Sequence, residues 1–113
     1  MNPIHLNLPP GSECSNYLYQ NLDIEDLTQD LLTVKLVTGF YIDVGWYPEH
    51  DPRGRYVIRV FHGTWDNQKL NRPITTRYVG EVVAHVEALA RHYCRTRVPA
   101  LQSSATIARP LTW

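Results

Sequence analysis

Glu81 and His85 are the two side chains in this sequence best spaced for acid–base chemistry, because they stand four residues apart. On a helix such residues share one face, so the carboxylate can orient the imidazole and raise its basicity, as a general base requires. They are therefore the two weak candidates for a catalytic site. His92 follows two helical turns later, about 10 Å along the axis, too far to share a metal ion with His85. Ordinary residues on a solvated helix face explain the same pattern and are the favoured interpretation.

Other chemistry-bearing residues form no recognisable constellation. Glu49, His50 and Asp51 are adjacent in a turn-rich segment, where neighbouring side chains rarely converge on one ion, and Asp51 is expected to cap backbone amides. Cys14 and Cys94 are eighty positions apart and match neither a disulfide framework nor a zinc pattern. The six glycines are scattered, so there is no phosphate-binding loop. The sequence predicts no cofactor and no metal, and it favours a protein that is not an enzyme.

Aromatic and basic residues alternate on one face of a predicted sheet, and they are better candidates for a binding site than the residues above. This predicted binding face comprises Lys35, Tyr41, Tyr47, Arg55, Arg59 and Phe61. One interpretation is contact with a protein partner or with a second copy of the chain. The alternative is RNA binding, with bases stacked on the rings and phosphates neutralised by arginines, Arg72 and Arg77 included. The zero net charge favours the protein partner, because strong phosphate attraction needs an excess of positive charge.

A period-two pattern predicts the strands that carry this face. An apolar even-numbered row runs from Leu32 to Trp46 and is broken at residues 37–39, where a three-residue hairpin places Gly39 in the left-handed conformation. This hairpin pairs Leu32 with Val44 across the two strands.

A third strand, from Arg55 to about Phe61, follows the turn-rich segment. Pairing Tyr47 with Arg55 keeps the apolar rows together and sets Asp43 opposite Arg59, which predicts an exposed ion pair between them.

The longest element is a helix predicted from an N-cap at Thr75 or Thr76 to about Arg97. Its apolar face is formed by Val79, Val82, Val83, Val86, Leu89, Ala90 and Tyr93. Gly80 inside the helix predicts the close approach of another backbone. A shorter helix, capped by Asp23, is predicted from Asp23 to Leu31.

These elements predict an α+β fold, a three-stranded antiparallel meander packed on one long C-terminal helix, with the short helix before the first strand. Residues 1–22 are expected to be an irregular N-terminal arm, residues 23–97 a single α+β domain, and residues 98–113 a tail with little structure. The 113 residues fit one domain.

Charge and hydropathy complete the expectations. Residues 1–52 hold eight acids and one base, a net of −7, while residues 53–113 hold ten bases and three acids, a net of +7. We expect the two halves to interleave in the fold and neutralise each other. The first residues do not resemble a signal peptide and no apolar run is long enough to cross a membrane, which predicts a cytoplasmic protein with no membrane partner. The sequence thus predicts a small non-enzymatic protein-interaction or self-association module, with an RNA-binding domain as the alternative.

Overall fold

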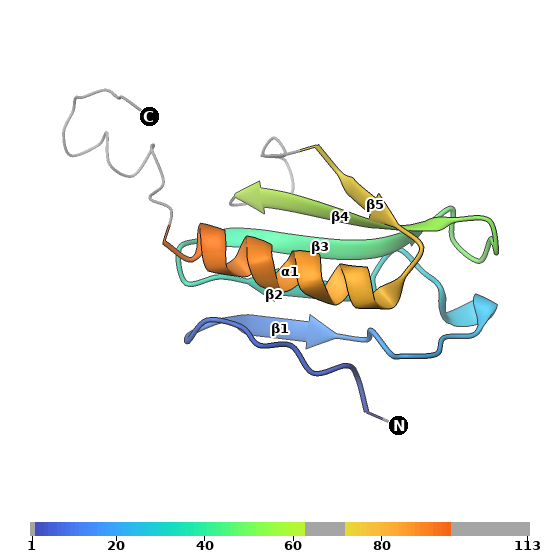
Figure 1. The fold of residues 1–113 in the computed structure, drawn as a ribbon, viewed down its shortest axis with the longest axis horizontal. Helices are drawn as coiled ribbons and strands as arrows, with labels where there is room; N and C mark the ends of the chain where they lie inside the picture. Colours follow the sequence, from blue (N-terminus) through green and yellow to red (C-terminus); the bar gives the residue numbers. More distant parts are fainter. Residues whose placement is uncertain (1, 63–71, 96–113) are drawn as a thin grey trace.

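A five-stranded antiparallel sheet with one long helix on one of its faces forms this protein (Figure 1). The structure is a computed structural model that describes residues 2–62 and 72–95. The strands lie in chain order and are β1 (Glu13–Asn16), β2 (Leu32–Lys35), β3 (Phe40–Tyr47), β4 (Arg55–His62) and β5 (Ile74–Thr76), followed by the helix α1 (Val79–Tyr93). The predicted α+β class is confirmed, while the predicted number of three strands is wrong.

The two missed strands are the short ones at the sheet edges. β1 lies within the first 22 residues and has no alternation of apolar and polar side chains, and β5 follows Pro73 and is three residues long. Each becomes a strand because the neighbouring strand offers it backbone partners, as Cys14 pairs with Val34 and Thr75 with Val57. Edge strands this short carry too few residues for a periodic signal.

The register of the three central strands is confirmed. Leu32 pairs with Val44, and Tyr47 pairs with Arg55, as the continuity of the apolar rows requires. In the hairpin between β2 and β3, the Leu36 N–H donates to the Phe40 carbonyl at 2.8 Å, and Gly39 has a φ of +92°. The hairpin turn is therefore the left-handed glycine turn that the sequence predicts.

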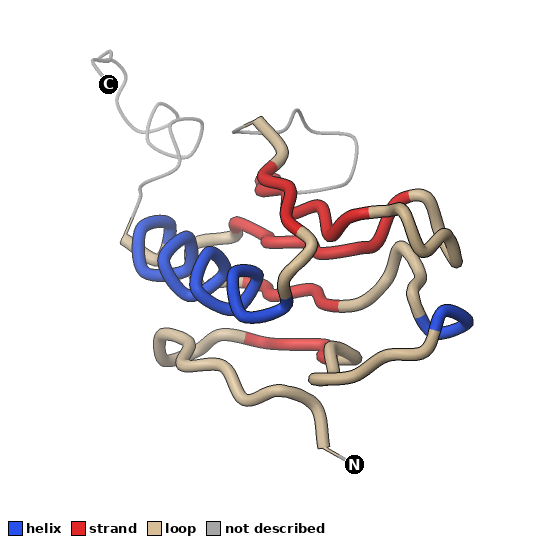
Figure 2. The backbone as a smooth tube through the Cα atoms, turned by 45° about the vertical axis from the view of Figure 1, so that its right-hand side comes forward, coloured by secondary structure: helices blue, strands red, loops and turns tan. Residues whose placement is uncertain are grey.

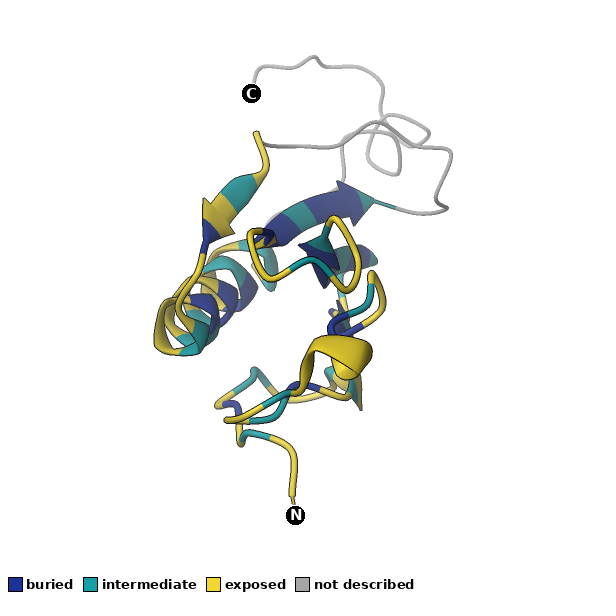
Figure 3. Ribbon diagram, turned by 90° about the vertical axis from the view of Figure 1, so that its right-hand side faces the viewer, coloured by how far each residue is buried: buried dark blue, intermediate teal, exposed yellow. Residues whose placement is uncertain are grey.

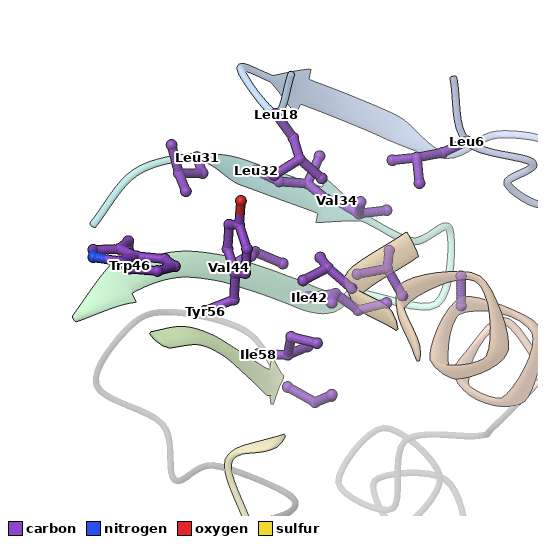
Figure 4. Packing of buried hydrophobic residues seen from close by; sticks show 14 of the residues in the cluster. Leu6, Leu18, Leu31, Leu32, Val34, Ile42, Val44, Trp46, Tyr56 and Ile58 are labelled. Carbon is purple, nitrogen blue, oxygen red and sulfur yellow. The ribbon is translucent and has the colours of Figure 1, made fainter. Parts of the chain in front are cut away.

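The core lies between the even-numbered face of the sheet and the buried side of α1, which packs against β3, β4 and β5 (Figure 3). Val82, Val86 and Ala90 of the helix are completely buried. Figure 4 shows how side chains from successive strands meet there, including Trp46 and Tyr56, whose ring centroids are 5.0 Å apart.

The first residues of the chain also belong to this core. Leu6 and Leu18 are both buried in it, and the stretch before β1 runs back alongside that strand (Figure 2). The Ile4 N–H donates to the Leu18 carbonyl at 2.8 Å, and the Asn7 N–H donates to Glu87 Oε2 on α1 at 2.8 Å. Backbone hydrogen bonds and apolar burial together hold this stretch against the sheet and the helix.

The short helix predicted over Asp23–Leu31 is wrong, since only the three-residue 3₁₀ turn η1 (Ile24–Asp26) forms. Asp23 makes no capping bond with its side chain. The chain after the turn pairs with β3 instead, because the Trp46 N–H donates to the Thr28 carbonyl and the Leu31 N–H to the Val44 carbonyl. Tertiary pairing thus outweighs the local helical pattern.

The limits of α1 also differ from the prediction. The helix begins at Val79 after Tyr78, while Thr76 lies in β5 and accepts a hydrogen bond from the Tyr78 N–H at 3.1 Å. It ends at Tyr93, before the predicted Arg97, where the Thr38 hydroxyl donates to the Tyr93 carbonyl at 2.8 Å. The β2–β3 hairpin therefore satisfies a terminal carbonyl of the helix. The predicted tail, residues 98–113, lies outside the described residues.

Gly80 does not have the predicted close neighbour, since no heavy atom of the described residues outside the adjoining backbone of α1 lies within 4 Å of where a Cβ would stand. The close approach occurs at Gly45 in β3, where a Cβ would collide with the carbonyl oxygen of Gln29. Gly45 lies against Gln29, in the segment that replaces the predicted short helix. Only a residue without a side chain fits there.

Candidate functional site on the outer sheet face

The sheet face turned away from α1 carries the predicted binding face. We call this side of β2, β3 and β4 the outer face, and it is formed by Thr33, Lys35, Tyr41, Asp43, Gly45, Tyr47, Arg55, Val57, Arg59 and Phe61. All six residues of the predicted binding face belong to it, because the confirmed register keeps the odd-numbered positions on one side. The structure thus brings these six residues together on one surface.

Two of the cations on the outer face lie against aromatic rings. Lys35 Nζ is 5.9 Å from the centroid of the Tyr41 ring, and the Arg59 guanidinium carbon is 5.1 Å from the centroid of the Tyr47 ring. These distances are typical of cation–π contacts. Arg55 faces Tyr47 across the two strands and is exposed. The arrangement presents half-buried rings and charged heads side by side.

Phe61 differs from the other five residues of the predicted binding face. Its side chain is 7% exposed, whereas Lys35 and Arg55 are exposed and both tyrosines are half-buried. A partner that approaches the outer face therefore meets charged heads and tyrosine rings, and little of Phe61.

Asp43 is a buried acid in the middle of this face. Its side chain is 7% exposed, and Thr33 Oγ1 donates to its carboxylate at 3.4 Å. The pKa of Asp43 is raised from 3.8 to about 6, because burial, helped by the nearby charge of Asp30, outweighs the lowering effects of the Thr33 hydrogen bond and of Arg59. This carboxyl therefore changes its charge close to neutral pH.

Arg59 does not form the predicted exposed ion pair with Asp43. The two residues are backbone partners as expected, yet their side chains are not joined by an ion pair in the described part of the chain. Arg59 Nε is buried and has no hydrogen-bond acceptor among the described residues. The prediction is wrong because the guanidinium is drawn over Tyr47 and because Asp43 is buried.

Glu81 and His85, the weak catalytic candidates, lie exposed on α1, away from the outer face. Glu81 Oε1 accepts a hydrogen bond from the Thr76 hydroxyl. Glu81 is thus engaged at the start of the helix, and among the described residues no hydrogen bond joins it to His85.

The turn between β3 and β4 uses its polar residues for structure. Glu49 Oε2 accepts from the Gln29 N–H at 2.8 Å, and a ring nitrogen of His50 lies 3.1 Å from the Ile24 carbonyl oxygen. Asp51 Oδ1 accepts from the Arg53 N–H at 2.8 Å, a bond that lowers the pKa of Asp51, so this residue caps a backbone amide as predicted. Residues 2–62 and 72–95 contain no group of three His, Cys, Asp or Glu side chains that could hold a metal ion.

Arg77 has a structural role that the sequence did not indicate. Its guanidinium donates to the carbonyls of Gly54 at 3.0 Å and Pro52 at 2.9 Å, and it lies 6.0 Å from the Trp46 ring. Trp46 belongs to the core face, so Arg77 does not extend the positive charge of the outer face. No local sequence motif predicts this contact, because it requires β5 to pair with β4.

Comparison with known proteins yields no match for this chain among protein-family models, curated proteins or solved structures. Across the part of the chain that the structure describes, no helix is both long enough and apolar enough to span a membrane.

Proposed function

We propose that this chain is a small non-enzymatic interaction module that binds a protein partner or a second copy of itself through the outer face. The observation that carries the proposal is that two cations lie against half-buried tyrosine rings on this face, Lys35 over Tyr41 and Arg59 over Tyr47. Tyrosine and arginine are enriched in protein interfaces, where rings supply contact area and guanidinium groups supply directed hydrogen bonds.

The zero net charge supports association between copies as well, because it leaves no overall repulsion between them. A cytoplasmic location forms part of the same proposal. It is supported by Cys14 and Cys94, both of which are free thiols, as is usual in a reducing compartment.

RNA binding is the second candidate, and the charge layout argues against it. A continuous positive stripe would favour nucleic acid, whereas the exposed Glu13 faces the exposed Lys35 across β1 and β2 and places a negative charge beside that cation. Arg77, which would extend such a stripe, is held by the turn between β3 and β4. Alternating signs are better matched by the mixed surface of a protein.

The test is site-specific photo-crosslinking in the cell that naturally makes the protein. A photoreactive phenylalanine analogue replaces Tyr41 on the outer face or, as the matched control, Tyr78, which is 69% exposed beside the start of α1. We expect protein adducts from position 41 and none from position 78. An adduct of twice the chain mass identifies a second copy, which light scattering of the purified protein over a range of concentrations then checks.

Two outcomes would overturn the proposal. One is an adduct from position 41 that ribonuclease digests, which assigns the face to RNA. The other is the formation of the same protein adducts from positions 41 and 78. Such adducts would show that the contacts are not specific to the outer face.

A further inference from the structure

Asp43 has few hydrogen-bond donors around its carboxyl, and the Arg59 guanidinium has an N–H donor without an acceptor in the described part of the chain. The Asp43 carboxyl is buried, and in the described part of the chain its hydrogen bond comes from the Thr33 hydroxyl, at the long distance of 3.4 Å. Arg59 Nε is a buried donor that finds no acceptor within residues 2–62 and 72–95. A buried donor left unsatisfied is costly, and so is a buried carboxylate with too few donors. The two residues face each other directly across β3 and β4.

The position of Tyr47 explains why these side chains remain apart. The Arg59 guanidinium carbon lies 5.1 Å from the centroid of the Tyr47 ring, a contact that competes with the carboxyl for the same cation. Gly45 stands between Asp43 and Tyr47 along β3 on the outer face, and the backbone of Gln29 fills the place of its missing side chain. One guanidinium therefore has two partners within its reach, a carboxyl and an aromatic ring.

The geometry points to a proton-controlled switch in which Arg59 stays over Tyr47 while Asp43 is protonated, and turns to pair with Asp43 once that carboxyl has ionised. The step releases one proton from Asp43 to solvent and creates one carboxylate, whose charge the guanidinium then balances. The Tyr47 ring is uncovered as Arg59 leaves it. This inference does not depend on the proposed function, since the switch operates within a single chain.

The surrounding groups place this switch near neutral pH. Facing Asp43 are the Thr33 hydroxyl from β2, the Asp30 carboxylate from the segment before β2, and Arg59 from β4. Lys35, the cation of β2, lies over the Tyr41 ring. Burial and Asp30 oppose ionisation more strongly than Thr33 and Arg59 favour it, so that the pKa of Asp43 is about 6.

The test follows both partners by NMR across a pH titration of the labelled protein. We expect the carboxyl ¹³C resonance of Asp43 and the Nε resonance of Arg59 to shift together, with one apparent midpoint, and the Tyr47 ring signals to move with them. In Asp43→Asn the Arg59 and Tyr47 shifts should disappear. The Lys35–Tyr41 contact on the same face is the internal control and should not follow that midpoint.

A second variant keeps the test decisive if Asp43→Asn does not fold. Thr33→Val removes a hydrogen bond to the ionised carboxylate and should therefore raise the pH midpoint of the resonance shifts. The Asp43 carboxyl resonance and the Arg59 Nε resonance should move to the same new midpoint. The inference is overturned if Arg59 Nε stays constant while Asp43 titrates, or if the two resonances have different midpoints.

Discussion

Asp43 shows how burial can outweigh attraction between directly facing charges. The register that sets it opposite Arg59 follows from the apolar rows, and the same register places Thr33 opposite Asp43. These neighbours are therefore predictable from the sequence. The burial of Asp43 is not, because a position on the face away from the helix reads as exposed when only the alternation of residues is known.

Replacing the buried carboxyl tests this account. In the folded protein the pKa of Asp43 lies at about 6, above its ordinary value of 3.8, so folding favours the protonated form. This contribution to stability is fully present below the ordinary pKa and is lost as the pH rises through about 6. At neutral pH we expect Asp43→Asn to raise the free energy of unfolding by about 1–3 kcal/mol.

Urea denaturation of both proteins at several pH values measures the effect. The stability difference should shrink towards zero as the pH falls below the ordinary pKa of aspartate. If Asp43→Asn instead weakened the protein at neutral pH, the pairing of the ionised carboxylate with Arg59 would have to outweigh the cost of burying its charge.

Among the elements, long amphipathic segments are predictable and short ones are not. The alternating row from Leu32 to Trp46, which forms β2 and β3, and the apolar face of α1 contain enough residues to reveal a period. β1, β5 and η1 have three or four residues each, so their structure depends on the segments that pack or pair with them. The segment after η1 illustrates this, since it forms backbone bonds with β3 where a helix had been predicted.

Two glycine-to-alanine substitutions separate close approach from intrinsic helix preference. Gly80→Ala adds a methyl group to open space in a helix, so it should stabilise the protein by about 0.5–1 kcal/mol. Gly45→Ala drives a methyl group into the backbone of Gln29, so it should destabilise the protein by about 1–3 kcal/mol. Thermal denaturation of the two variants provides the comparison, and equal effects would contradict the placement of the 28–31 segment.

In the molecule as a whole, the first residues and the central domain share one core. Leu18 is completely buried, and Leu6 joins the same apolar cluster as the residues of the sheet and the helix. Sequence patterns did not reveal this packing, because Pro9, Pro10 and Gly11 interrupt every period in the segment. The burial of its leucines depends on the finished sheet offering them a place.

Truncating Leu18 should therefore cost as much as truncating a central core residue. We expect Leu18→Ala to lower the free energy of unfolding by about 2–5 kcal/mol. Val37→Ala is the matched control, since Val37 is 67% exposed and its loss should change stability by less than about 0.5 kcal/mol. Chemical denaturation distinguishes the two, and a small effect of Leu18→Ala would mean that the first residues are not part of the cooperative unit.

The strand order has a kinetic consequence. Each strand pairs with its neighbours in sequence, so the chain can build the sheet hairpin by hairpin, closing a short loop such as the β2–β3 turn at little entropic cost. The bond from the Asn7 amide to Glu87 is different, since its partners are eighty residues apart. We expect it to form after the sheet and α1 are assembled. The same stretch should open first when the folded protein fluctuates, so its amides should exchange with solvent sooner than those of β3.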